Sequence, residues 1–294
     1  MFEIFEIEFM QRAWLAGLIM AVICPLIGCF LVLRRQSLIG DGLGHIAFAG
    51  VTIGALGSCN PVLSAALATV LGALAIEKVR MRLNEAADMV LAIFFYTGMG
   101  LAVIFTGLNH GSSINLSSIL FGSLMTVSRA DLIIVALLAL VTIGFVVCTY
   151  SELQYLTFDE TCARVSGLPV AKLNLLLALL TALTVALSMR IVGLLLVSAM
   201  MVIPVACALQ TAKCFRATIY QSIAYGLATV CLGLISSYYF NLAPGGTVVV
   251  TGSLLFALSI CFKPRPQSTD LNEPCPVCEQ KPKMRYTIFS RHKH

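Results

Sequence analysis

The sequence is dominated by apolar runs of about 20 residues, separated by short polar connections. A run of that length crosses the hydrocarbon core of a bilayer as an α-helix. The strands of a membrane barrel would alternate apolar and polar residues, and these runs do not. Of the 294 residues, 59% are hydrophobic and only 11% are charged, with a mean hydropathy of +0.94. We therefore expect an all-α polytopic membrane protein, which excludes disordered, fibrous, nucleic-acid-binding and single-domain soluble classes.

Nine runs are long enough to cross the membrane. They cover residues 13–33, 40–58, 61–79, 87–107, 132–150, 173–190, 192–212, 217–240 and 246–262. We expect the sixth and seventh runs to be joined by a tight turn near Met189 and Arg190. The stretch 114–127 is also apolar and is interpreted as a segment that re-enters the membrane without crossing it. The pattern also permits eight or ten spans.

The positions of the basic residues predict an orientation, because cytoplasmic loops are enriched in Lys and Arg. With the N-terminus outside, only Arg12, Arg129 and Arg190 of the 19 basic residues lie in external connections. The acidic start of the chain does not resemble a signal peptide. We expect residues 1–262 to form a transmembrane domain in the cell membrane. The polar, Pro-rich residues 263–294 are expected to form a flexible cytoplasmic tail.

One segment, which runs from Arg34 to Val51, combines two ionisable residues with several glycines. Asp41 and His45 are four residues apart, so they share one face of a helix. A carboxylate and an imidazole on one face can bind zinc, manganese or iron, which makes both residues candidate metal ligands. Alternatively, Asp41 pairs with a neighbouring arginine and His45 hydrogen-bonds a carbonyl. Gly40, Gly44, Gly50 and Gly54 form small-xxx-small pairs that allow close helix contact.

A second segment lies between two cytoplasmic ends of spans. Thr157 and Glu160 have the spacing of a capping box, and Gly167 followed by Pro169 ends the helix. We expect a helix of about two turns over 158–166. It could serve as a rigid contact for a cytoplasmic partner or as a mere connector.

Two further features have more than one interpretation. Pro204 removes a hydrogen bond within an apolar helix and indicates a kink, either beside a pathway or for packing alone. The tail carries candidate metal ligands at Cys275, Cys278, His292 and His294. A disordered tail with incidental ligands is the alternative.

The cysteines within apolar runs are expected to be free thiols.

Several catalytic motifs are missing from the sequence. There is no Gly-Lys-Ser/Thr phosphate loop, no His-Glu-x-x-His and no Gly-x-Ser-x-Gly. The chain is therefore not expected to be an enzyme or to hydrolyse ATP itself.

Together these motifs resemble the membrane permease of ATP-binding-cassette importers for zinc, manganese and iron, over about residues 10–262. The resemblance rests on the Arg34–Gly50 stretch, Leu120–Ser123, the 159–169 loop, Gly193–Pro204 and Pro244–Gly246. One departure is Gly44, where many members have Ser.

The resemblance implies a vitamin-B12-importer-like fold that works as a homodimer by alternating access. It implies a cytoplasmic ATPase that binds ATP, an external metal-binding protein, and a transported divalent metal, with zinc favoured over manganese or iron. It places Asp41 and His45 in the metal pathway. It makes 158–166 a coupling helix in which Asp159, Glu160, Ala163 and Gly167 match the family pattern. The alternatives are an ion-coupled secondary carrier, in which Asp41 would relay protons, and an intramembrane enzyme.

Overall fold

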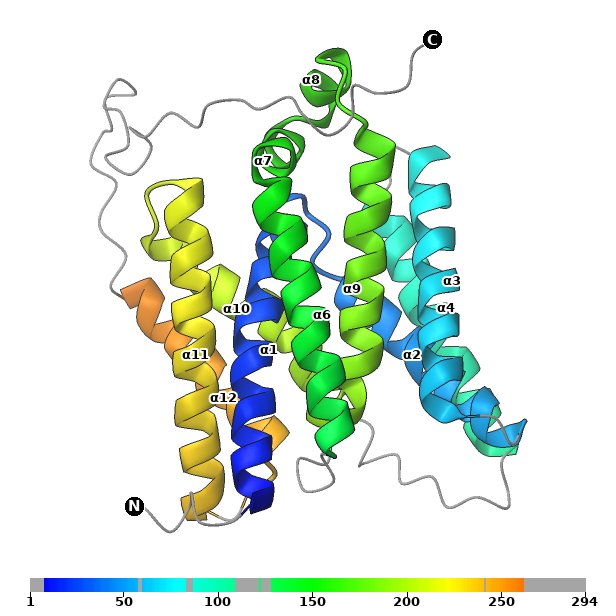
Figure 1. Cartoon of the computed structure of the whole chain (residues 1–294), viewed down its shortest axis with the longest axis vertical. Coiled ribbons are helices and arrows are strands. Elements are labelled where there is room, and N and C mark those ends of the chain that lie inside the picture. Colours follow the sequence, from blue (N-terminus) through cyan, green and yellow to red (C-terminus); the bar gives the residue numbers. More distant parts are fainter. Residues whose placement is uncertain are drawn as a thin grey trace.

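The computed structural model describes residues 8–57, 60–82, 87–108, 122, 128–240 and 242–261. Their regular secondary structure is entirely helical (Figure 1). Nine helices in these ranges are long and apolar enough to cross a membrane. They are α1 (Glu8–Leu33), α2 (Ile39–Leu56), α3 (Pro61–Arg82), α4 (Ala87–Leu108), α6 (Arg129–Cys148), α9 (Val170–Val192), α10 (Leu194–Thr211), α11 (Phe215–Phe240) and α12 (Pro244–Cys261). Two short helices, α7 (Tyr150–Phe158) and α8 (Glu160–Val165), lie between α6 and α9.

Each predicted span corresponds to one long helix, and the structure confirms the predicted polytopic helical class. The helices alternate in direction, with α7 and α8 at the end of the bundle opposite the start of α1 (Figure 1). An ion pair of 3.6 Å between Arg190 and Asp131 joins α9 to α6 at the end away from α8. Most of the apolar stretch 114–127, and the tail with Cys275, Cys278, His292 and His294, lie outside the described residues.

The predicted turn near Met189 and Arg190 is wrong. Helix α9 continues to Val192, and the chain changes direction at Gly193, where φ is 93°. This positive φ is strained for residues with a side chain, whereas Met and Arg are good helix formers. Gly122 packs against the Val192–Gly193 peptide, so this one described residue of the expected re-entrant segment contacts the break.

Helices α1, α2 and α9 supply much of the core, and the outer helices expose their apolar side chains. Ile23, Ile27 and Phe30 of α1 are completely buried. By contrast, Leu71 of α3 and Leu140 of α6 are mostly exposed. Exposed apolar side chains on long helices are expected where lipid is the solvent. The central helices are therefore the ones that can position a polar site away from lipid.

Glycines allow α2 to approach its neighbours closely. A Cβ atom at Gly50 would lie 2.7 Å from Cβ of Ala68 and 2.9 Å from Cα of Ala65, both on α3. On the α4 side, a Cβ atom at Gly98 would lie 3.0 Å from the backbone nitrogen of Ile46. The expected small-residue packing of α2 is therefore present.

The capping box predicted for Thr157 and Glu160 is also wrong. Asp159 is the N-cap of α8, and its carboxylate accepts hydrogen bonds from the backbone N–H groups of Thr161 (2.8 Å) and Cys162 (2.9 Å). Thr157 instead belongs to α7, and its hydroxyl donates to the Leu153 carbonyl. The two-turn helix expected over 158–166 is thus one short helix, α8, preceded by a separate helix. Gly167 ends it with φ of 78°, as predicted.

The hydrogen bonds to the Asp159 carboxylate, chiefly those involving Cys162, hold its pKa below the ordinary value. A lowered pKa means that the cap stabilises α8 above the ordinary aspartate range. That stabilisation is lost only as the pH falls through the folded-state pKa. The cap is consequently intact at neutral pH.

The packing around α2 predicts that two matched glycine substitutions differ in their effect on stability. Gly50→Ala should destabilise the protein by about 1–3 kcal/mol, because the new methyl group meets α3 backbone atoms. Gly100→Ala in α4 meets nothing within 4 Å and should be neutral or slightly stabilising. Thermal unfolding of both variants in detergent measures the difference. Equal melting temperatures would contradict the close contact.

The observed cap predicts which substitution loosens α8. Asp159→Ala should accelerate hydrogen exchange at the backbone amides of Thr161 and Cys162, because both lose their acceptor. Thr157→Ala should leave these amides unchanged. Hydrogen exchange at neutral pH, followed by mass spectrometry, compares the two variants. Faster exchange in Thr157→Ala alone would restore the rejected capping box.

Candidate functional site

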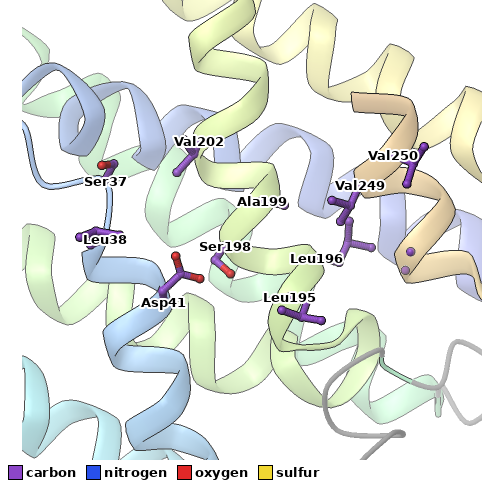
Figure 2. Close-up of a pocket in the computed structure, with 12 residues that line it drawn as sticks. Ser37, Leu38, Asp41, Leu195, Leu196, Ser198, Ala199, Val202, Val249 and Val250 are labelled. Atoms are coloured by element: carbon purple, nitrogen blue, oxygen red, sulfur yellow. The ribbon is translucent and has the colours of Figure 1, made fainter. Parts of the chain in front are cut away.

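An open groove of about 520 Å³ runs between the start of α2, the first half of α10 and the start of α12. It is lined by Ser37, Leu38, Asp41, Leu195, Leu196, Ser198, Ala199, Val202, Gly245, Gly246, Val249 and Val250. Asp41 is the only ionisable residue of this lining. Figure 2 shows Asp41 on α2 and Ser198 on α10 facing the space between their helices. The groove is therefore a mostly apolar surface that carries one carboxylate.

Small residues bring the two helices together at this point. A Cβ atom at Gly40 would lie 3.3 Å from Sδ of Met201 and 3.8 Å from Cα of Ser198. The Ser198 hydroxyl donates to the Leu194 carbonyl within its own helix, so its oxygen lone pairs face away from that bond. Carboxylate and hydroxyl oxygens beside one another can bind a divalent cation.

His45 lies one turn further along α2 and is not part of the groove lining. Its ring packs edge-on against Phe95 of α4, with ring centroids 4.9 Å apart. The structure thus places Asp41 at the groove and His45 at the contact between α2 and α4. Within the described ranges, no group of three or more His, Cys, Asp and Glu side chains is arranged to hold a metal ion. Asp41 and His45 are therefore two candidate ligands and not a complete cage.

Pro204 lies in α10 beyond the groove. The helix continues through it from Leu194 to Thr211, and Pro204 is buried. Val202, two residues earlier, lines the groove. Pro204 itself is thus a packing residue next to the groove.

A second polar cluster surrounds Glu160, where the ends of α1 and α3 meet the start of α8. One carboxylate oxygen lies 3.4 Å from Arg34 and 3.5 Å from Arg80, and the other lies 3.2 Å from Arg164. Arg80 also makes a two-point contact with Glu77, with distances of 2.7 and 3.0 Å. We call Arg34, Glu77, Arg80 and Glu160 the charge cluster. It joins the end of α1, the end of α3 and the start of α8.

The sequence patterns did not predict the charge cluster. Glu77 and Arg80 are three residues apart on one helix, so their pairing is readable from spacing. Arg164 likewise follows Glu160 by four residues, but Arg34 and Arg80 are 126 and 80 residues away from Glu160, and no local pattern indicates them. Burial lowers the pKa of Arg34, the neighbouring Arg80 lowers it further, and Glu160 raises it. Glu160 therefore offsets the repulsion between two buried arginines.

The other predicted coupling residues have distinct places. Ala163 is buried and belongs to the main hydrophobic core, so it anchors α8. Asp159 caps the helix and Gly167 ends it. The outer surface of α8 and its flanks is formed by the exposed residues Phe158, Thr161, Cys162 and Val165. Val165 is 85% exposed, which leaves an apolar side chain free at the tip of the bundle.

The chain matches the ABC 3 transport family over residues 6–263. Among curated proteins, it is 35% identical over 258 residues to a probable metal transport system membrane protein of Treponema pallidum. That match covers 87% of this chain and 96% of the relative. It is also 30% identical over 261 residues to the high-affinity zinc uptake system membrane protein ZnuB of Haemophilus influenzae, covering 89% and 99% of the two chains.

Among solved structures, the chain resembles PsaBC from Streptococcus pneumoniae in complex with Fab. The TM-score is 0.76 with 28% sequence identity, and the match covers 87% of this chain and 92% of that chain. This agreement supports the predicted permease fold. The helical membrane architecture, the family match and the relatives agree: the chain belongs to the ABC 3 transport family and is a membrane permease subunit of a metal importer.

Proposed function

We propose that two copies of this chain form the membrane pathway of an ATP-driven importer for zinc, with Asp41 and His45 as metal ligands. The observation that carries the proposal is the position of Asp41, a carboxylate in an otherwise apolar groove of a membrane helix bundle. Ionisable residues within a membrane are expensive and usually line a pathway or meet a partner.

The groove supports a second copy as the facing wall. Leu195 and Val250 of its lining are 44% and 59% exposed, so the groove opens on the surface of a single chain. A carboxylate that faced lipid there would be costly, and a second copy would cover it. The facing chain would also bring further ligands, since zinc in proteins usually takes about four.

The outer surface of α8 supports a cytoplasmic ATPase as partner. The sequence has no phosphate-binding loop, so the energy would come from another subunit. Val165 on the short, well-capped α8 and Phe158 at the end of α7 are exposed apolar side chains, which suits insertion into a partner's groove. At the opposite end of the bundle, an external metal-binding protein would deliver the ion.

Zinc is our choice among three metals. Relatives of similar identity are named for zinc, for manganese and, with the word probable, for iron. An imidazole ligand suits zinc and iron, whereas manganese prefers oxygen ligands. His45 therefore favours zinc or iron over manganese. Between these two, zinc is our choice because the relative named for zinc carries an unqualified name, whereas the relative named for iron is called probable.

Substitutions at the two ligands test the pathway. Asp41→Asn and His45→Gln should each lower metal uptake by at least about tenfold, because each removes one ligand of the ion. Asp88→Asn is the matched control, since Asp88 is an exposed carboxylate in the first turn of α4. Uptake of zinc, manganese and ferrous iron is measured in cells that produce equal amounts of each variant.

The same assay separates the alternatives. Wild-type uptake should be greatest for zinc, and a preference for manganese or iron would overturn that choice. Normal uptake by both ligand variants would reject their role. Uptake that follows a proton gradient without ATP would indicate a secondary carrier.

The tail 263–294 is proposed to be a separate cytoplasmic extension. The family match ends at residue 263, which supports a transport domain that is complete without the tail. Cys275, Cys278, His292 and His294 would bind zinc that leaves the pathway and slow import when cytosolic zinc is high.

Truncation after Lys263 tests both statements. Basal uptake should stay within about twofold of wild type, because removing residues outside the bundle is expected to alter stability little. Uptake at high internal zinc should rise, because the proposed inhibitory ligands are gone. Loss of basal uptake would contradict a dispensable tail. Identical uptake by both proteins at high zinc would reject the feedback.

A further inference from the structure

The charge cluster is neutral and almost sealed from solvent. The exposed fractions of the side chains are 6% for Arg34, 6% for Glu77, 11% for Arg80 and 34% for Glu160. Two cations and two anions therefore balance one another in a poorly solvated place. Loss of one partner from such a cluster leaves a buried charge without compensation, which is strongly unfavourable.

Within the charge cluster, Glu160 forms the ion pairs that link different helices, because it contacts both Arg34 and Arg80. Arg80 keeps Glu77 as a partner on its own helix. Among the described residues, Glu160 is the only ion-pair partner of Arg34. The carboxylate of Glu160 is thus directed back toward α1 and α3, whereas Phe158 and Val165 form the exposed surface. Glu160 is the first residue of α8, and its carboxylate faces Arg34 and Arg80.

Both arginines belong to segments that are connected to α2 or packed against it, and α2 is the helix that carries Asp41. Arg34 directly follows α1 and begins the connection to α2. That connection is held by backbone hydrogen bonds from Gln36 to the Leu31 carbonyl and from Ile39 to the Gln36 carbonyl. Arg80 lies on α3, which packs closely against α2 at Gly50. A displacement of α8 can therefore reach α2 both through the connection that follows Arg34 and along α3.

We propose that Glu160 is the positioning residue that transmits movement of α8 to α2, through Arg34 and Arg80. This inference rests on the proposed function, in which an ATPase moves α8. If α8 shifts, either the arginines move with it or their ion pairs break in a buried place. Because breaking the pairs is unfavourable, α1 and α3 move together with α8, and α2, which flanks the groove, moves with them.

The test uses the complete complex of this chain with its ATPase, reconstituted in lipid vesicles, with the external metal-binding protein supplied on the side from which metal is imported. Three variants are compared with wild type: Glu160→Gln, Arg34→Gln and the double variant. Arg164→Gln is the control, because Arg164 also contacts Glu160 but its side chain is 63% exposed. ATP hydrolysis and uptake of zinc, manganese and ferrous iron are measured together, and the readout is metal imported per ATP hydrolysed for the ion that wild type carries.

We expect Glu160→Gln and Arg34→Gln each to lower metal imported per ATP by about tenfold while hydrolysis continues. The double variant should be no worse than Glu160→Gln, because the two residues act as one contact. Arg164→Gln should keep the wild-type ratio. An unchanged ratio in Glu160→Gln, or additive losses in the double variant, would overturn the inference. So would parallel losses of hydrolysis and uptake, which indicate a purely structural role.

Two further measurements keep the result decisive. If Glu160→Gln does not assemble with the ATPase, Glu160→Asp keeps the charge on a shorter side chain and should assemble with a lowered ratio. A wild-type ratio in Glu160→Asp would then overturn the inference. If the wild-type complex imports none of the three metals when ATP is supplied, the proposed function itself fails. Wild-type import combined with a normal ratio in Glu160→Gln rejects only the transmission.

Discussion

The absence of water in the core of a bilayer is the constraint on which this structure depends. Every backbone N–H and C=O group there must be satisfied inside the protein, and a helix does so within one segment. The chain consequently forms nine long helices in the part that the structure describes, with short connections between them. Departures from helix are placed where protein covers them, as at Gly193, whose neighbouring peptide packs against Gly122.

Close helix contact follows from the same constraint. Lipid is as apolar as the helix surfaces, so burial of apolar area drives association weakly and van der Waals packing becomes important. The glycines of α2 allow it to approach α3, α4 and α10, and this central helix brings Asp41 to the groove. Glycine at these positions is thus a requirement of the site as well as of the fold.

Charges in this protein are few, and their partners explain their positions. Asp41 lies in the groove without an ion pair in the described part of the chain, which suits a residue that meets a cation from outside. Glu160 has three arginine partners, two of them nearly buried, which suits a residue that holds helices together. The contrast separates a group available to a substrate from a group committed to the structure. It also agrees with the different roles proposed for the two carboxylates.

Length and hydrophobicity alone predicted that the spans are helices and indicated nine of them, because these two properties decide what crosses a bilayer. The sequence motifs also pointed to the family, and the matching relatives confirm that assignment. The site could be predicted from the sequence only in part, because residue spacing placed Asp41 and His45 on one helix face and indicated nothing more. The groove that receives Asp41, and the Phe95 ring that covers His45, come from helices elsewhere in the chain.

The helix cap, the helix break and the long-range ion pairs followed from tertiary structure, because local sequence patterns left each of them ambiguous. Thr157 and Asp159 both suit an N-cap, and the separate helix α7, which claims Thr157, leaves the cap to Asp159. The helix break fell at Gly193 and not at Arg190, because only glycine readily adopts the backbone angle required there. The ion pairs of Glu160 with Arg34 and Arg80 were undetermined by sequence, since ion pairs between distant segments leave no periodic signal. They exist because the fold brings the ends of α1, α3 and α8 to one place, where buried charges must be paired.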